Sequence, residues 1–150
     1  MSYFKIKSHA KLNMALHVTG KKAFLHKLES IVSFIDLHDE IWIKKIISNH
    51  HKIIFNGKFS KNIHKQNTIS KLLEILEKRK ILKKDKFHIK IIKKIPNKAG
   101  FGGGSVNAAS ILKYFVKKKI INIKKKDEIE ISKLIGSDVV LGLKQKSLIL

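Results

Sequence analysis

The residues best suited to chemistry lie in one glycine-rich segment, from Pro96 to Ala109. Four of the five residues from Gly100 to Gly104 are glycine, in a chain that contains only eight. Glycine permits positive φ angles and lets backbone N–H groups approach an anion closely. The segment follows an expected strand and precedes an expected helix, whose N-terminus would add unpaired donors and partial positive charge. We therefore predict a cradle for a di- or triphosphate rather than a flexible connector.

Two common phosphate-binding loops do not fit this segment. A Walker loop requires a lysine directly after its last glycine, whereas Ser105 follows Gly104. The dinucleotide pattern G-x-G-x-x-G fails because its third glycine position, counted from Gly100, is also Ser105. No downstream acidic residue is well placed for a ribose either. The sequence therefore requires another kind of phosphate loop.

The segment resembles the signature of the GHMP kinases, P-x-x-x-G-L-G-[GS]-[GS]-S, with Phe101 in place of leucine. Its G-G-G-S-x-N-A-A spelling is most similar to family members that phosphorylate a cytidine-diphosphate-linked methylerythritol. The resemblance implies ATP-dependent phosphorylation of the 2-hydroxyl of that small molecule, a step of non-mevalonate isoprenoid biosynthesis. It also implies that the following residues bind ATP: Pro96, Asn97, Lys98, Ala99, Gly100, Phe101, Gly102, Gly103, Gly104 and Ser105.

Two further stretches support the resemblance and carry the expected catalytic residues. Ala10–Gly20 is similar to the family's A-K-[LIV]-N-L-x-L-x-[IV]-x-G segment, which implies that Lys11 lies at the reacting hydroxyl and Asn13 contacts substrate. The stretch G-S-D-V-V is similar to G-[AS]-D-V-P, with valine in place of proline, and implies that Asp138 is the catalytic base. One carboxylate and positive charge are a sufficient set, because phosphoryl transfer depends mainly on positioning and electrostatics.

Substrate-side positions match the family less well. His26 resembles the histidine of G-x-x-x-D-G-[YF]-H, which holds the cytosine. Here the segment from Gly20 is one residue shorter, and Leu25 stands where an aromatic ring would stack on the base. Asn67 and Lys93 match family positions near the adenine and before the loop, with less specific motifs.

The resemblance implies magnesium together with the nucleotide. Phosphate oxygens would hold most of its coordination sites, with Ser105 as a contributor. We predict no metal cluster made of protein side chains alone, because the histidines show no metal-ligand spacing and the chain has no cysteine.

The elements around these motifs predict an α+β domain. Alternation predicts strands at 3–7, 12–19, 26–37, 39–45 and 52–55, and another from Phe87 up to Pro96, where proline stops it. Helices are expected to begin near Asn67, after the glycine loop, and near Asp127, where Asp127 and Glu130 offer a capping arrangement. Residues 147–150 are expected to form a strand. The resemblance implies the fold of the GHMP kinase N-terminal domain, a mixed and mostly antiparallel sheet with packed helices.

The composition is strongly basic, with 33 Lys and Arg residues, 11 Asp and Glu residues and a net charge of +22. Such charge attracts polyanions, so a nucleic-acid-binding module is an alternative. Arg79 is the only arginine, however, and nucleic-acid surfaces usually use arginine for bidentate contacts. The abundance of Lys, Ile and Asn is typical of an A/T-rich genome. We therefore expect no specific nucleic-acid partner.

Length and patterning predict a single soluble, cytoplasmic domain. No segment is apolar enough for a leader or a membrane span, and no repeat or linker divides the 150 residues. GHMP kinases are about twice as long on a two-domain expectation. We therefore expect 1–150 to be an N-terminal ATP-binding domain with the C-terminal domain absent. An inactive truncated kinase fragment is a second alternative, and the oligomeric state is not predicted.

Overall fold

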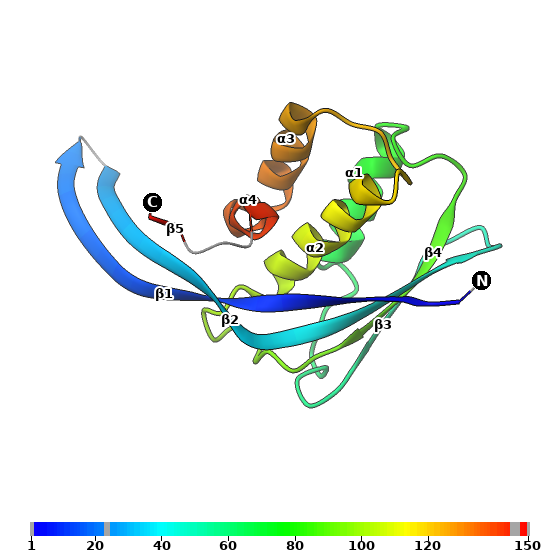
Figure 1. The fold of residues 1–150 in the computed structure, drawn as a ribbon, viewed down its shortest axis with the longest axis horizontal. Helices are drawn as coiled ribbons and strands as arrows, with labels where there is room; N and C mark the ends of the chain where they lie inside the picture. The colour runs from blue at the N-terminus through cyan, green and yellow to red at the C-terminus, as the bar shows by residue number, and fades with distance from the viewer. Residues whose placement is uncertain (1, 23–24, 145–147, 150) are drawn as a thin grey trace.

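A computed structural model describes residues 2–22, 25–144 and 148–149, which form one sheet with helices on a single face (Figure 1). The strands are β1 (Phe4–Lys22), β2 (Leu25–Ile46), β3 (Lys52–Asn56), β4 (Lys86–Ile92) and β5 (Leu148–Ile149). Their order is β1-β2-β4-β3, with β5 paired to β2. The β3–β4 pair is parallel, and the other pairs are antiparallel. The predicted α+β fold with a mostly antiparallel mixed sheet is confirmed.

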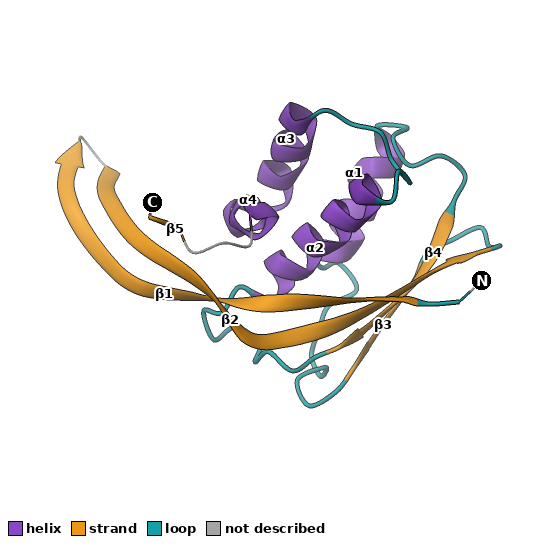
Figure 2. Cartoon of the chain, in the orientation of Figure 1, coloured by secondary structure: helices purple, strands orange, loops and turns teal. Residues whose placement is uncertain are grey.

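Strands β1 and β2 are longer than the sequence pattern predicted. Each replaces two predicted strands, and the expected breaks are register shifts rather than ends. The shift between His9 and Lys11 lies at the break expected between 7 and 12, whereas the one between Asn13 and Ala15 lies inside the predicted strand 12–19. A bulge inserts an extra residue and bends the strand without ending it, so it interrupts alternation as a loop would. The pair curves away beyond the helices, where β5 joins it (Figure 2).

Within the described part of the chain, four helices cover the sheet: α1 (Thr68–Lys78), α2 (Gly103–Lys117), α3 (Lys125–Ile135) and α4 (Ser137–Lys144). Helix α1 begins as predicted, because the Asn67 side chain accepts hydrogen bonds from the backbone N–H groups of Ile69 and Ser70 at 3.0 and 3.1 Å. Helix α2 is buried along most of its length against β1, α1 and α4. The core between sheet and helices includes Ile41, Ile43, Leu72, Leu76, Ile89, Ile91, Ile111, Leu112 and Phe115.

The C-terminal helices differ in detail from the prediction. Helix α3 begins at Lys125, so Asp127 lies inside its first turn and accepts a hydrogen bond from the Lys124 backbone N–H at 3.2 Å. Helix α4 was not predicted, because it has only eight residues and follows α3 after the single residue Gly136. Strand β5 covers Leu148–Ile149 of the predicted final strand. Among the described residues, no helix is long and apolar enough to cross a membrane.

Candidate active site

The glycine loop joins β4 to α2 and has the backbone conformation that its composition predicts. Gly100 and Gly102 have φ angles of 76° and 64°, values that disfavour any residue with a Cβ. Gly102 is the N-cap of α2 and provides no side-chain hydrogen bond to the helix. The first N–H groups of α2 are therefore available to an anion, at the positive end of the helix dipole.

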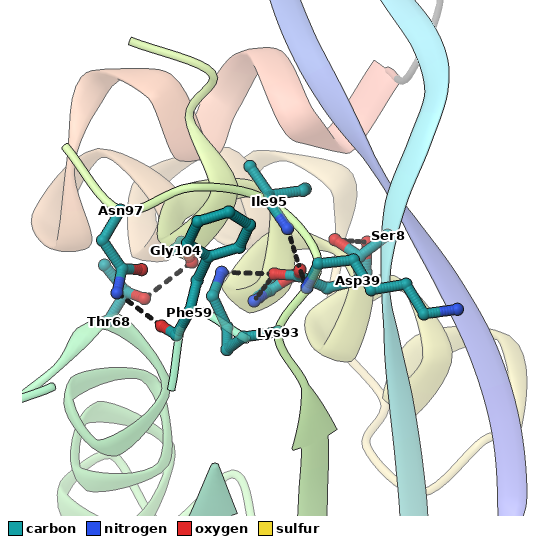
Figure 3. Close-up of polar contacts among 11 residues, drawn as sticks. Ser8, Asp39, Phe59, Thr68, Lys93, Ile95, Asn97 and Gly104 are labelled. Atoms are coloured by element: carbon teal, nitrogen blue, oxygen red, sulfur yellow. Dashed lines mark hydrogen bonds and ion pairs between the residues drawn. The ribbon is translucent and has the colours of Figure 1, made fainter. Parts of the chain in front are cut away.

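A hollow of about 230 Å³ opens over this loop. All ten predicted ATP-binding residues line it, together with Thr68 and Lys93. The Thr68 hydroxyl donates a hydrogen bond to the Gly104 carbonyl at 2.6 Å, and the Asn97 amide donates one to the Phe59 carbonyl at 2.6 Å. The first contact holds Gly104 to the start of α1, and the second holds Asn97 to the segment that precedes α1 (Figure 3). The lining of the hollow thus includes four glycines and two lysines, Lys93 and Lys98.

The buried carboxylate of Asp39 holds the glycine loop in place. Asp39 is fully buried, and its Oδ1 accepts hydrogen bonds from the backbone N–H groups of Lys94 and Ile95 at 2.7 and 2.8 Å. Its Oδ2 pairs with the Lys93 ammonium and accepts a hydrogen bond from the Asn107 amide at 2.9 Å (Figure 3). Asp39 thereby joins β2 to both arms of the glycine loop. Because the buried carboxylate has this many partners, it holds the segments bonded to it in a fixed arrangement.

Lys11 and Asp138 meet beside the loop, although 127 positions separate them in the sequence. The Lys11 ammonium donates a hydrogen bond to Asp138 Oδ2 at 3.1 Å. Lys11 is also fixed through its backbone, because its N–H donates to the Phe101 carbonyl at 2.8 Å. The Lys11 side chain is only 7% exposed, whereas that of Asp138 is 40% exposed. The lysine is therefore buried, whereas the carboxylate of Asp138 is partly exposed to solvent.

Helix α4 determines where Asp138 lies. Asp138 is in the first turn of α4, where the helix dipole favours a negative charge. Gly142, on the same helix, packs directly against Ala109 of α2. Since α2 begins at the glycine loop, this contact positions the carboxylate relative to that loop.

The two predicted substrate residues are less constrained. Asn13 is exposed on β1, two residues beyond Lys11 and on the same face of the strand. The backbone of His26 belongs to β2 and pairs with Lys21, but its side chain lies outside the part that the structure describes. Their roles stay predictions.

Sequence reasoning did not find Asp39 or Asn107. Asp39 occupies a polar position in an alternating stretch, where an exposed aspartate is the ordinary interpretation. Asn107 lies among the small residues of α2, and its Oδ1 is buried without a hydrogen-bond partner. Asp39 lies between His38 and Glu40, so no local signal distinguishes it from an exposed aspartate.

These observations define an α+β domain in which a lysine–aspartate pair stands beside a glycine-rich loop. Residues 67–145 match the family profile described as GHMP kinases N terminal domain. The chain therefore belongs to the GHMP kinase family.

Comparison with individual proteins shows which members of the family the chain resembles. The chain is 61% identical over 150 residues to a 4-diphosphocytidyl-2-C-methyl-D-erythritol kinase of Pelagibacter ubique (strain HTCC1062), covering 100% of this chain and 53% of the relative. It is 35% identical over 136 residues to the protein of the same name from Finegoldia magna, covering 89% and 48%. A crystal structure of 4-(cytidine 5'-diphospho)-2C-methyl-D-erythritol kinase shares the fold, with a TM-score of 0.77 at 22% identity, covering 98% of this chain and 51% of the other. The chain thus spans about half the length of the relatives it matches.

Proposed function

We propose that this chain is the nucleotide-binding part of an ATP-dependent kinase for 4-diphosphocytidyl-2-C-methyl-D-erythritol, acting in isoprenoid precursor biosynthesis. The observation that carries the proposal is the 3.1 Å contact between Lys11 Nζ and Asp138 Oδ2 beside the glycine loop. The names of the relatives supply the acceptor. GHMP kinases are ATP-dependent, and the hollow over the loop suits a triphosphate.

In the proposed reaction, a substrate hydroxyl attacks the γ-phosphorus of ATP. The bond between that phosphorus and the β,γ-bridging oxygen breaks, ADP leaves, and the hydroxyl proton passes to the Asp138 carboxylate. Lys11 orients this carboxylate and places positive charge where the attacking oxygen and the phosphoryl group become negative. The N–H groups at the start of α2 hold the phosphates in line.

The residues around the hollow fit a magnesium nucleotide. Ser105 lines the hollow, and the partly exposed Asp138 carboxylate pairs with Lys11 beside the loop. Asp39 has both oxygens occupied by hydrogen bonds, so it does not suit a metal. Mg²⁺ would therefore be held mainly by phosphate oxygens, and its charge would neutralise them during transfer.

The test is incubation of the protein with ATP, Mg²⁺ and this substrate, with the phosphorylated product followed by ³¹P NMR. Asp138→Asn is expected to lower the rate by about 10²–10⁴-fold while ATP binding persists. Asp85→Asn is the matched control, because Asp85 is 38% exposed and also pairs with a lysine, Lys45, at 2.7 Å. Absence of product, or product formation that Asp138→Asn leaves unchanged, contradicts the proposal.

A further inference from the structure

The outer face of the sheet carries a group of metal-ligating side chains that the proposed kinase reaction does not use. His9 on β1 lies opposite His38 on β2 in the antiparallel ladder, and Asp36 lies two residues before His38 on β2. Each of the three offers one ligand atom, and these atoms all lie within 4.8 Å of one another. The chain neighbours Ser8 and Asp39 are fully buried toward the helices. By alternation, His9 and His38 therefore point to the helix-free face.

Both histidines have one ring nitrogen fixed by the backbone. His9 Nδ1 lies 3.0 Å from the Ile35 carbonyl oxygen, and His38 Nδ1 lies 2.6 Å from the Asp36 carbonyl oxygen. A carbonyl oxygen only accepts hydrogen bonds, so Nδ1 carries the proton in each ring. Each Nε2 then presents a lone pair. Histidines that ligate metals are usually oriented in this way, by a hydrogen bond from the other nitrogen to a carbonyl or carboxylate.

Asp36 supplies the negative charge that such a site requires. It is exposed, and among the residues that the structure describes no cationic side chain pairs with it. Its neighbours in the strand behave differently, since Asp39 pairs with Lys93 and Glu40 with Lys94. In a chain with 33 basic and 11 acidic residues, an aspartate left without a lysine beside two histidines stands out.

We infer that His9, His38 and Asp36 form a site for a divalent transition-metal ion of the Zn²⁺ class. Two imidazoles and one carboxylate suit zinc, and water would complete a four-coordinate shell. Zinc bonds of about 2.0–2.1 Å place ligand atoms roughly 3.4 Å apart in a tetrahedron. The three side chains therefore need to close by at most about 1.4 Å from 4.8 Å. Sequence reasoning did not find this grouping, because cross-strand neighbours have no characteristic spacing; its expectation of no protein-only metal cluster is what the titration below tests.

The position of the site gives the metal a structural effect. It would join β1 to β2 at the register shift between His9 and Lys11, where the ladder is interrupted. Lys11 is two residues away along β1, and Asp39 directly follows His38 along β2. Metal binding would thus hold together the two backbone segments that carry Lys11 and Asp39.

The experiment is titration of the metal-free protein with Zn²⁺ by calorimetry, and with Co²⁺ by visible absorption. One ion per chain is expected, with no comparable binding of Mg²⁺. The variants His9→Gln, His38→Gln and Asp36→Asn are each expected to weaken Zn²⁺ affinity at least about tenfold, whereas His64→Gln, which removes an exposed histidine elsewhere, leaves it unchanged. At Zn²⁺ about 100 times above Kd, the melting temperature should rise by about 5 °C or more.

Circular dichroism of each variant separates lost binding from lost folding, and Asp36→Asn, at an exposed position, provides the variant least able to disturb the fold. No binding of one Zn²⁺ by the parent protein would overturn the inference. The inference would also be overturned if none of the three variants changed the Zn²⁺ affinity, or if His64→Gln lowered that affinity equally. None of these measurements depends on ATP or on phosphotransfer, so this inference and the proposed kinase function fail independently.

Discussion

Gly142 of α4 lies so close to Ala109 of α2 that a Cβ atom added to Gly142 would be 2.7 Å from the Ala109 Cβ and 3.3 Å from the Val106 Cα. Real side chains do not approach at the shorter distance, and the second neighbour is backbone. The glycine therefore sets the separation of the two helices. Since α4 carries Asp138 and α2 begins at the glycine loop, it also sets the distance between the carboxylate and the phosphate cradle.

We expect Gly142→Ala to move α4 and to lower both stability and phosphotransfer. Overpacking costs about 1–3 kcal/mol, which outweighs the gain of up to about 1 kcal/mol in helix propensity. Urea denaturation and the ³¹P NMR assay measure the two effects. Gly136→Ala is the control, because the nearest atom to its added Cβ would be Val139 Cγ2 at 4.0 Å. A Gly142→Ala protein with unchanged or raised stability would show that the helix contact is not close.

Substitution of the buried Asp39 should lower stability strongly, and a second substitution should recover part of the loss. Asp39→Asn leaves the buried Lys93 ammonium without its counter-charge, so the free energy of unfolding should fall by about 3–5 kcal/mol. Adding Lys93→Met removes the unpaired charge and should recover part of that loss. Denaturant unfolding of the two single variants and the double variant gives the coupling between the residues. Additive effects would mean that the pair does not interact.

The sequence predicted the local features of the site, and only its resemblance to a family indicated Lys11 and Asp138, which pair across 127 positions. The glycine loop and the Asn67 cap each follow from neighbouring residues. The bulges in β1 could not be predicted, because a bulge and a loop interrupt alternation in the same way. The groups around Asp39 and around His9 arise from strand pairing and helix packing, and no spacing within one segment encodes them.

His51 predicts a loss of stability in mild acid. Its Nδ1 accepts a hydrogen bond from the Phe87 backbone N–H at 3.0 Å, and its Nε2 lies 3.1 Å from Glu77 Oε1. Burial lowers the pKa of His51 below its ordinary value of 6.5. Because the folded-state pKa is the lower one, the unfolded chain takes up the proton first as pH falls below 6.5.

The stability that His51 contributes is therefore full above pH 6.5 and decreases as pH falls toward the folded-state pKa. We expect urea midpoints to decrease between about pH 7 and pH 5. His51→Gln, which does not take up a proton in this range, should flatten this part of the profile, whereas the exposed-site variant His64→Gln should not. A profile with the same slope in the parent and in His51→Gln would exclude His51 as the cause.

The contact between Gly102 and Lys11 predicts that two similar glycine substitutions have different effects. Gly100 and Gly102 both have positive φ angles, so alanine strains the backbone at each, by about 1 kcal/mol. At Gly100 an added Cβ meets no atom within 4 Å. At Gly102 it would lie 3.3 Å from Lys11 Cε and 3.5 Å from Lys11 Cβ.

Gly102→Ala should therefore displace the Lys11 side chain, which is only 7% exposed and has little room to move. Misplacement of a catalytic group by about 1 Å can cost on the order of 100-fold in rate. We expect Gly102→Ala to reduce phosphotransfer at least about tenfold more than Gly100→Ala, while the two variants lose similar stability. The ³¹P NMR rates and urea midpoints of both proteins give the comparison. If the two variants lose activity equally, backbone strain in the loop is sufficient and Lys11 does not act through this contact.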